Sequence, residues 1–205
     1  SRVVMLGDSI VNDTGNSPWE VLVEQRHPGL RLEVVTSVRG GTGCWYYKDE
    51  GRVTPYVLDF EPDLLMIGGI SHNSDTEAIR SVIRQACPER SRRVRGVAPV
   101  RAQDNSTLEQ VCNHVPAEER ARHHQPGDNA PSSPPDILLM TGAFGNDRDP
   151  RMLPDWSPSV TRGDGSYRSR LMALAAEEGC GFLDLEGAWG SYLLGVEQPY
   201  AWFMR

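Results

Sequence analysis

The sequence lacks both a long apolar run and an excess of basic residues. No apolar run in the 205-residue chain approaches the roughly 20 residues that a helix needs to cross a bilayer, so no membrane insertion is expected. Lys and Arg number 21 against 28 Asp and Glu, which gives a formal net charge of −7. Nucleic-acid binding depends on clustered positive charge to displace counterions, so no nucleic-acid partner is expected either.

Cysteine is also scarce. The four cysteines lie far apart and form no CxxC pair: Cys44, Cys87, Cys112 and Cys180. This spacing predicts neither a zinc site nor a disulfide framework. The cysteines therefore favour neither an oxidising nor a reducing compartment for the protein. Cys112 has three histidines nearby in the sequence, but their irregular spacing in a charged segment favours a solvated surface over a metal site.

What the chain does contain is an alternation of strand-like and helix-like segments. Helical spacing of apolar residues predicts helices over Asp75–Ala86, with Ser74 and Glu77 as a capping box, and over Tyr167–Glu178, which Gly179 ends. The predicted strands are five short apolar runs: Val3–Leu6, Leu32–Val35, Leu64–Ile67, Ile137–Met140 and Phe182–Leu185. This alternation predicts an α/β fold, a three-layer α/β/α sandwich with a five-stranded parallel sheet of flavodoxin-like type.

The length predicts one domain over residues 1–205, interrupted by one irregular segment. Between residues 87 and 135 the chain is rich in Arg, Glu, Pro, Ser and Asn and poor in apolar residues. Such a composition buries too little apolar area to offset the entropy of ordering. We therefore expect a low-complexity surface insertion between a helix and a strand.

Gly7, Asp8 and Ser9 follow the first predicted strand directly. The carboxyl ends of parallel strands form the edge at which α/β sheets usually bind ligands, so Ser9 could act there as a nucleophile. The amino end of the following helix would favour the negative charge that develops during attack on an ester. The alternative is that Ser9 caps this helix, a position that Asp8 could fill equally well.

Two motifs add to this candidate. The segment GDSI around Ser9 resembles the first conserved block of the GDSL, or SGNH, hydrolases, in which the serine attacks acyl esters. The segment VVTSVRGGTG resembles the second block, in which a loop glycine donates its N–H to the oxyanion hole; Gly41 matches best and Gly40 next. A tight turn that requires positive φ would explain these glycines equally well.

The third block of the family reads Gly-x-Asn-Asp, whereas this chain reads GGISHNSD. Counting from the preceding strand places His72 at the position of the asparagine, while residue type favours Asn73. Either side chain can donate an N–H to an oxyanion. Alternatively, residues 71–75 only cap the next helix.

The fourth block, Asp-x-x-His, supplies the general base of the family and has no counterpart in this sequence. None of the five histidines has an aspartate three residues before it: His27, His72, His114, His123 and His124. The final segment EGAWGSYLLGVEQPYAWFMR is similar to the approach to that block. The expectation is a chain truncated at its carboxyl end, with activity impaired by the lack of the histidine.

The resemblance implies a serine esterase that needs no cofactor and acts on acyl esters, with acetylated carbohydrate the preferred substrate class. The site residues expected on this basis are Ser9, Gly41 and Asn73 for catalysis and Asp8, His72, Trp45 and Asn146 for substrate binding. One alternative is a non-catalytic carbohydrate-binding or scaffold domain with a degenerate site. A flavodoxin-like nucleotide or flavin binder shares the architecture, but no GxGxxG follows the first strand. The oligomeric state stays open.

Overall fold

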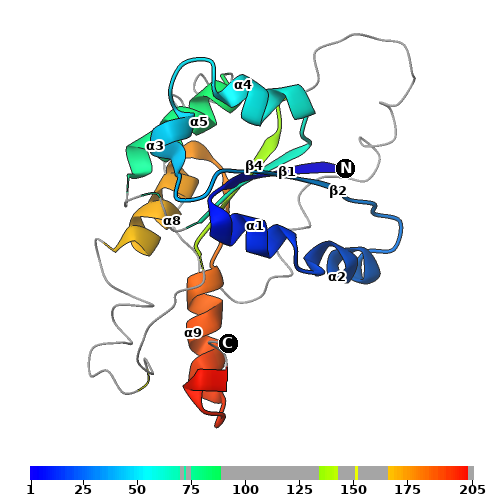
Figure 1. Ribbon diagram of the computed structural model, residues 1–205, viewed down its shortest axis with the longest axis vertical. Coiled ribbons are helices and arrows are strands. Elements are labelled where there is room, and N and C mark those ends of the chain that lie inside the picture. The colour runs from blue at the N-terminus through cyan, green and yellow to red at the C-terminus, as the bar shows by residue number, and fades with distance from the viewer. Residues whose placement is uncertain (70–71, 73–74, 89–133, 143–150, 152–165, 203–205) are drawn as a thin grey trace.

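A five-stranded parallel sheet forms the centre of the molecule (Figure 1). The computed structural model describes residues 1–69, 72, 75–88, 134–142, 151 and 166–202. The strands are β1 (Arg2–Gly7), β2 (Glu33–Val38), β3 (Leu64–Ile67), β4 (Asp136–Met140) and β5 (Gly181–Leu183). Their order is β2-β1-β3-β4-β5, and every neighbouring pair is parallel. The predicted α/β fold with a five-stranded parallel sheet is confirmed.

The central strand β1 is buried on both faces. Val4 and Leu6 belong to one hydrophobic cluster, and Val3 and Met5 belong to a second cluster on the opposite face. Alternate side chains of a strand point to opposite faces, so a strand covered on both sides must be apolar along its whole length. This explains why the first predicted strand reads as a continuous apolar run.

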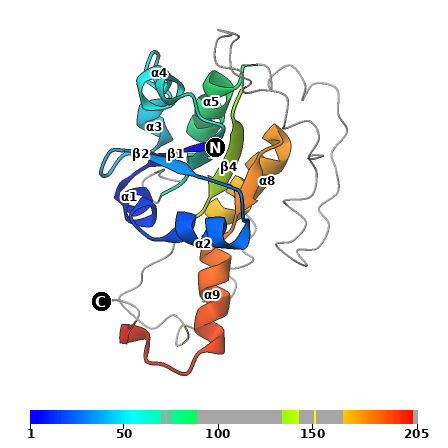
Figure 2. The same ribbon diagram turned by 90° about the vertical axis from the view of Figure 1, so that its right-hand side faces the viewer.

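Helices cover both faces of the sheet (Figures 1 and 2). The helices α1 (Ser9–Gly15) and α2 (Trp19–Arg26) lie on the face of Val3 and Met5. The opposite face is covered by α3 (Cys44–Tyr47), α4 (Val53–Tyr56), α5 (Thr76–Ala86) and α8 (Tyr167–Glu178). The remaining elements are η1 (Leu58–Phe60), α9 (Leu185–Gly195), which extends away from the sheet in Figure 1, and η5 (Tyr200–Trp202). Within the described ranges, no helix is both long and apolar enough to cross a membrane.

The predicted helices are present, with small differences at their ends. The cap of α5 is Asp75, which accepts the Ala78 N–H at 2.9 Å, whereas the predicted cap Ser74 lies outside the described residues. Gly179 ends α8 with φ of 66°, as predicted. The last strand ends at Leu183, two residues earlier than predicted, because Asp184 caps α9 by accepting the Gly187 N–H at 2.9 Å.

The two flanks of the irregular segment lie next to each other. The buried Cys87 thiol, directly after α5, donates to the Pro135 carbonyl, directly before β4, at 3.2 Å. Residues 89–133 between them are outside the described part of the chain. An insertion between α5 and β4 requires adjacent flanks of this kind, so the geometry is compatible with the predicted surface insertion.

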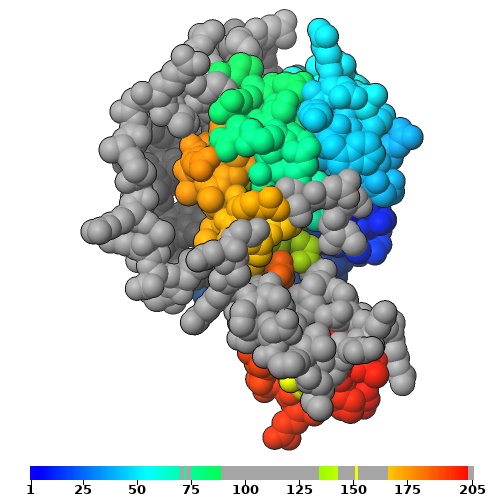
Figure 3. Space-filling model, turned by 90° about the vertical axis from the view of Figure 1, so that its left-hand side faces the viewer, coloured from blue at the N-terminus to red at the C-terminus, as the bar shows by residue number. Residues whose placement is uncertain are grey.

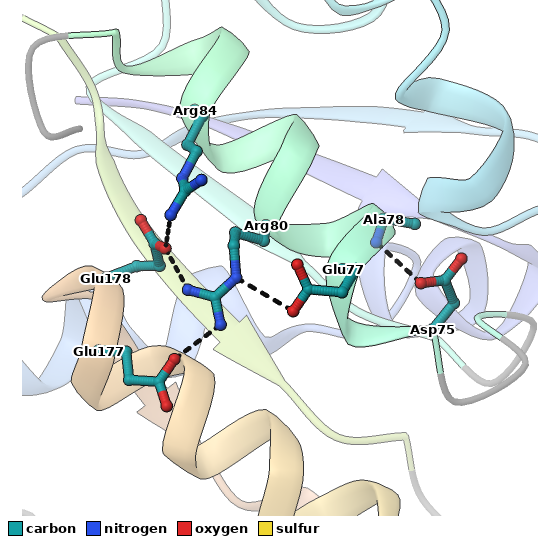
Figure 4. Close-up of polar contacts among 7 residues, drawn as sticks. All are labelled: Asp75, Glu77, Ala78, Arg80, Arg84, Glu177 and Glu178. Carbon is teal, nitrogen blue, oxygen red and sulfur yellow. Dashed lines mark hydrogen bonds and ion pairs between the residues drawn. The ribbon is translucent and has the colours of Figure 1, made fainter.

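A charged network joins α5 to α8, which lie side by side on one surface of the molecule (Figures 3 and 4). The Glu178 carboxylate is only 2% exposed and accepts from Arg80 and, at 3.0 Å, from Arg84. Arg80 also contacts Glu177 at 2.6 Å and Glu77 at 3.2 Å. A buried carboxylate needs such partners, because an unpaired charge in the interior is costly.

Replacing Arg80 by Met should therefore destabilise the protein far more than replacing Arg84 by Met. Arg80→Met keeps the apolar stem but leaves the buried Glu178 with one partially exposed partner, and we expect a loss of about 3 kcal/mol in the free energy of unfolding. The Arg84 side chain is 53% exposed, so Arg84→Met should cost about 1 kcal/mol or less. Urea unfolding of both variants measures the difference, and equal losses would contradict this account.

Candidate active site

Ser9 is the first residue of α1 and is exposed at the carboxyl end of β1. The cap of the helix is Asp8, whose carboxylate accepts the Ile10 N–H at 3.0 Å. The choice between Asp8 and Ser9 as cap, which the sequence leaves open, is therefore settled in favour of Asp8. In the described part of the chain, the Ser9 hydroxyl forms no hydrogen bond, so it is available for chemistry.

The Ser9 N–H is also available. Of the N–H groups in the first turn of α1, that of Ile10 donates to the Asp8 carboxylate, and those of Val11 and Asn12 donate to the Asp8 carbonyl at 3.1 and 3.2 Å. Among the described residues, no acceptor takes the Ser9 N–H. A helix start normally leaves such donors unsatisfied, and here the one that remains is that of the candidate nucleophile.

Gly41 presents a second backbone donor in the loop after β2. Gly41 has φ of 64°, in the left-handed region that glycine adopts most readily, and it is exposed. No described residue accepts the Gly41 N–H. The turn that the sequence allowed as an alternative is therefore present, and it leaves the N–H free to bind another group.

The end of β1 holds this loop in place. Gly7 is paired with Val38, and its carbonyl accepts two hydrogen bonds, from the Arg39 N–H at 3.2 Å and from the Tyr47 hydroxyl at 2.7 Å. Both donors flank Gly41 in the sequence. The loop that carries Gly41 is thus fixed to the residue two positions before Ser9.

The loop after β3 approaches the same edge. The Gly68 N–H donates to the Leu6 carbonyl at 3.1 Å. Gly69 has φ of 108°, and a Cβ placed on it would lie 2.5 Å from Asp8 Oδ1. Only glycine allows the backbone to pass so close to the cap. Asp8 itself is 1% exposed, so its carboxylate supports the start of α1 and has almost no surface for the predicted substrate contact.

His72 is buried between the second and third loops. It is 2% exposed, its Nδ1 accepts the Cys44 N–H at 3.1 Å, and its Nε2 lies 2.8 Å from the Gly68 carbonyl oxygen. Burial lowers the pKa of His72 below its ordinary value of 6.5. Since backbone groups occupy both ring nitrogens, neither nitrogen is directed at a substrate in this structure, unlike the expectation from the sequence.

The remaining predicted residues have different surroundings. Trp45, in the first turn of α3, is 39% exposed and packs edge-to-face on Tyr46 with ring centroids 6.4 Å apart. Tyr47, in the same short helix, is fully buried. Asn73 and Asn146 lie outside the described residues, so their predicted contacts stay predictions.

The Cys44 thiol also lies near this edge of the sheet, where it is fully buried. Burial, followed by the negative charge of Asp75, raises the pKa of the Cys44 thiol far above its ordinary value. A thiol is reactive as a thiolate, so a raised pKa disfavours Cys44 as a nucleophile. Among the described residues, no group of three or more His, Cys, Asp or Glu side chains is arranged to hold a metal ion.

No protein-family model matches the sequence, and a search of curated proteins finds no match. Solved structures, by contrast, share the fold. A variant of Axe2, an acetyl xylan esterase from Geobacillus stearothermophilus, matches with a TM-score of 0.53 at 18% identity, over 95% of this chain and 81% of that one. The acetyl xylan esterase AlAXEase matches with a TM-score of 0.51 at 15% identity, over 95% and 82% of the two chains.

A third match is a two-domain esterase (CEX) active on acetylated mannans, with a TM-score of 0.51 at 12% identity. That match covers 96% of this chain and 41% of the other. At these identities the likeness concerns the fold. The chain shares the α/β/α fold of these esterases, an architecture that agrees with the one implied by the resemblance of its motifs.

Sequence reasoning missed two groups that hold the candidate site together, the Tyr47 hydroxyl and the His72 imidazole. The aromatic run at residues 45–47 predicts stacking on a sugar ring or burial in the core for Tyr47, and the sequence predicts that His72 donates to a substrate. Tyr47 lies 40 positions from its partner Gly7, and His72 lies 28 positions from Cys44. No local pattern identifies such contacts.

Replacing Gly41 by Ala should strain the loop without a clash. The φ of 64° costs an alanine roughly 1–2 kcal/mol, although no atom lies within 4 Å of the added Cβ. Gly40→Ala is the matched control, since its Cβ also meets nothing within 4 Å and its φ is not positive. Urea unfolding should show the loss in Gly41→Ala alone; an equal loss in both variants would contradict the assigned backbone conformation.

Proposed function

We propose that the protein is a serine esterase that hydrolyses acyl esters through an acyl-enzyme formed on Ser9. The observation that carries the proposal is the exposed Ser9 hydroxyl and the free N–H groups of Ser9 and Gly41, which follow the carboxyl ends of the adjacent parallel strands β1 and β2. Preorganised N–H groups that point to a developing oxyanion are a main source of catalysis in acyl transfer.

In the proposed reaction, Ser9 Oγ attacks the acyl carbon while the hydroxyl proton passes to a base. The alcohol then leaves with a proton and the acyl group stays on Ser9. Water attacks the acyl-enzyme, releases the carboxylic acid and restores the hydroxyl. The Ser9 and Gly41 N–H groups hold the oxyanion in both steps, and Asn73 is proposed as the third donor because the nitrogens of the adjacent His72 are occupied. The 205 residues contain no Asp-x-x-His motif.

Acetylated carbohydrate is the proposed substrate class. Two proteins that share the fold are described as acetyl xylan esterases, and a third as active on acetylated mannans. Trp45 offers an exposed aromatic ring two residues after Gly43, the N-cap of α3, and sugar rings stack on such faces. We propose Trp45 and Asn146 as the residues that contact the sugar.

Labelling with a fluorophosphonate tests the nucleophile directly, because the reagent reports attack by the serine without requiring turnover. We expect one adduct, located on Ser9 by mass spectrometry of peptides, and no adduct in Ser9→Ala. Ser191→Ala changes an exposed serine on α9 and should label like the unchanged protein.

Hydrolysis of p-nitrophenyl acetate and release of acetate from acetylated xylan or mannan test the reaction. Ser9→Ala should lower any measurable rate by about a hundredfold or more. Labelling at another residue, or a rate unchanged in Ser9→Ala, would overturn the proposal. Binding of these polysaccharides without labelling or hydrolysis would instead indicate a non-catalytic carbohydrate-binding domain.

A further inference from the structure

The buried imidazole of His72 forms a bridge between two loops of the candidate site. The Cys44 N–H, at the start of α3, donates to Nδ1 at 3.1 Å, and Nε2 lies 2.8 Å from the Gly68 carbonyl oxygen, just after β3. Because Nδ1 accepts, the ring proton must lie on Nε2 and donate to Gly68. The contacts therefore specify one neutral tautomer.

We infer that His72 is a positioning residue, which as a neutral imidazole holds the loop of Gly41 against the loop that follows β3. Cys44 lies three residues after Gly41, and Gly68 precedes Gly69, whose backbone contacts Asp8, the neighbour of Ser9. The bridge is a property of the fold, whereas its effect on the chemistry of Ser9 rests on the proposed esterase function.

The surroundings of the ring decide whether it stays neutral. Among the described residues, the Gly68 carbonyl and the carboxylates of Asp8 and Asp75 act on the imidazole, and the Tyr167 ring stacks on it with centroids 6.3 Å apart. The Gly68 carbonyl and the two carboxylates favour the protonated form, but burial outweighs all three and lowers the pKa of His72. A protonated ring would also direct a second N–H at the Cys44 N–H, where two donors repel.

Acidification should thus break the bridge at its Nδ1 side. The folded protein favours neutral His72, while an unfolded chain binds the proton near the ordinary value of 6.5. The contribution of His72 to stability is present above about pH 6.5 and is lost as the pH falls from there toward the lowered pKa of the folded state. A histidine stabilised by an ion pair shows the opposite pH dependence: it stabilises the folded protein at low pH and loses this effect as the pH rises.

Nuclear magnetic resonance of the ¹⁵N-labelled 205-residue chain tests the bridge independently of any activity. We expect His72 to show the Nε2–H tautomer at pH 7.5 and the amide resonances of Gly41 and Cys44 to shift together with His72 on acidification. His27→Gln, which changes an exposed histidine, should leave those shifts unchanged. The Nδ1–H tautomer, or a titration of His72 that Cys44 and Gly41 do not follow, would overturn the inference.

Two variants separate the acceptor at Nδ1 from the rest of the ring. In His72→Asn, Oδ1 takes a position near that of Nδ1 and can accept the Cys44 N–H without titrating near neutral pH, whereas His72→Ala removes both contacts. Between pH 7.5 and 5, the urea midpoint of His72→Asn should fall less than that of the unchanged protein. An identical fall of the urea midpoint in both proteins would contradict the inference. If either variant fails to fold, the NMR titration of His72 in the unchanged chain still tests the inference.

The rate of phosphonate labelling at Ser9 tests the positioning role. His72→Ala should label up to about a hundredfold more slowly, the effect of misplacing a catalytic group by about 1 Å, and His72→Asn should recover part of the rate. If the unchanged protein does not label at Ser9, the proposed function fails. The NMR experiment still tests whether His72 bridges the two loops. If it labels and both variants label at the same rate, the positioning role fails and the esterase proposal survives.

Discussion

The Gly7 carbonyl, at the end of the central strand, is the acceptor on which the arrangement of the candidate site depends. It receives the Arg39 N–H and the Tyr47 hydroxyl, both from the segment after β2, while Gly7 itself leads through Asp8 into Ser9. A carbonyl has two lone pairs, and here both are used to fix one loop to the end of another strand. The candidate nucleophile and the Gly41 loop are therefore placed by the same backbone atom.

Two residues of the hydrophobic core also form hydrogen bonds that hold the candidate site. Tyr47 is fully buried among the apolar residues of one face of the sheet, yet its hydroxyl reaches the end of β1. Cys44 is equally buried, and its N–H donates to His72. Interiors are packed as densely as crystals and deform little, so groups anchored in them hold their positions well. The exposed donors at Ser9 and Gly41 thus lie on loops whose flanking residues belong to the core.

Much of the fold could be predicted because its determinants are local. Continuous apolar runs such as Leu64–Ile67 are typical of strands covered on both faces, and the motif around Ser9 indicated the edge where the loops meet. The roles of Asp8 and His72 could not be predicted in this way. Aspartate and serine are comparable caps, so only the backbone geometry decides between them, and the partners of a buried imidazole are set by the packing of separate strands.

The capping arrangement also explains how a carboxylate can lie next to a serine meant to bind an anion. Asp8 is buried and negatively charged, which by itself opposes a second negative charge nearby. Its side chain and its carbonyl take the N–H groups of Ile10, Val11 and Asn12 and leave that of Ser9. Had Ser9 been the cap, its hydroxyl would have been bound to the backbone of its own helix and withheld from a substrate. Because Asp8 accepts the free N–H groups at the start of the helix, both the hydroxyl and the N–H of Ser9 remain without a partner among the described residues.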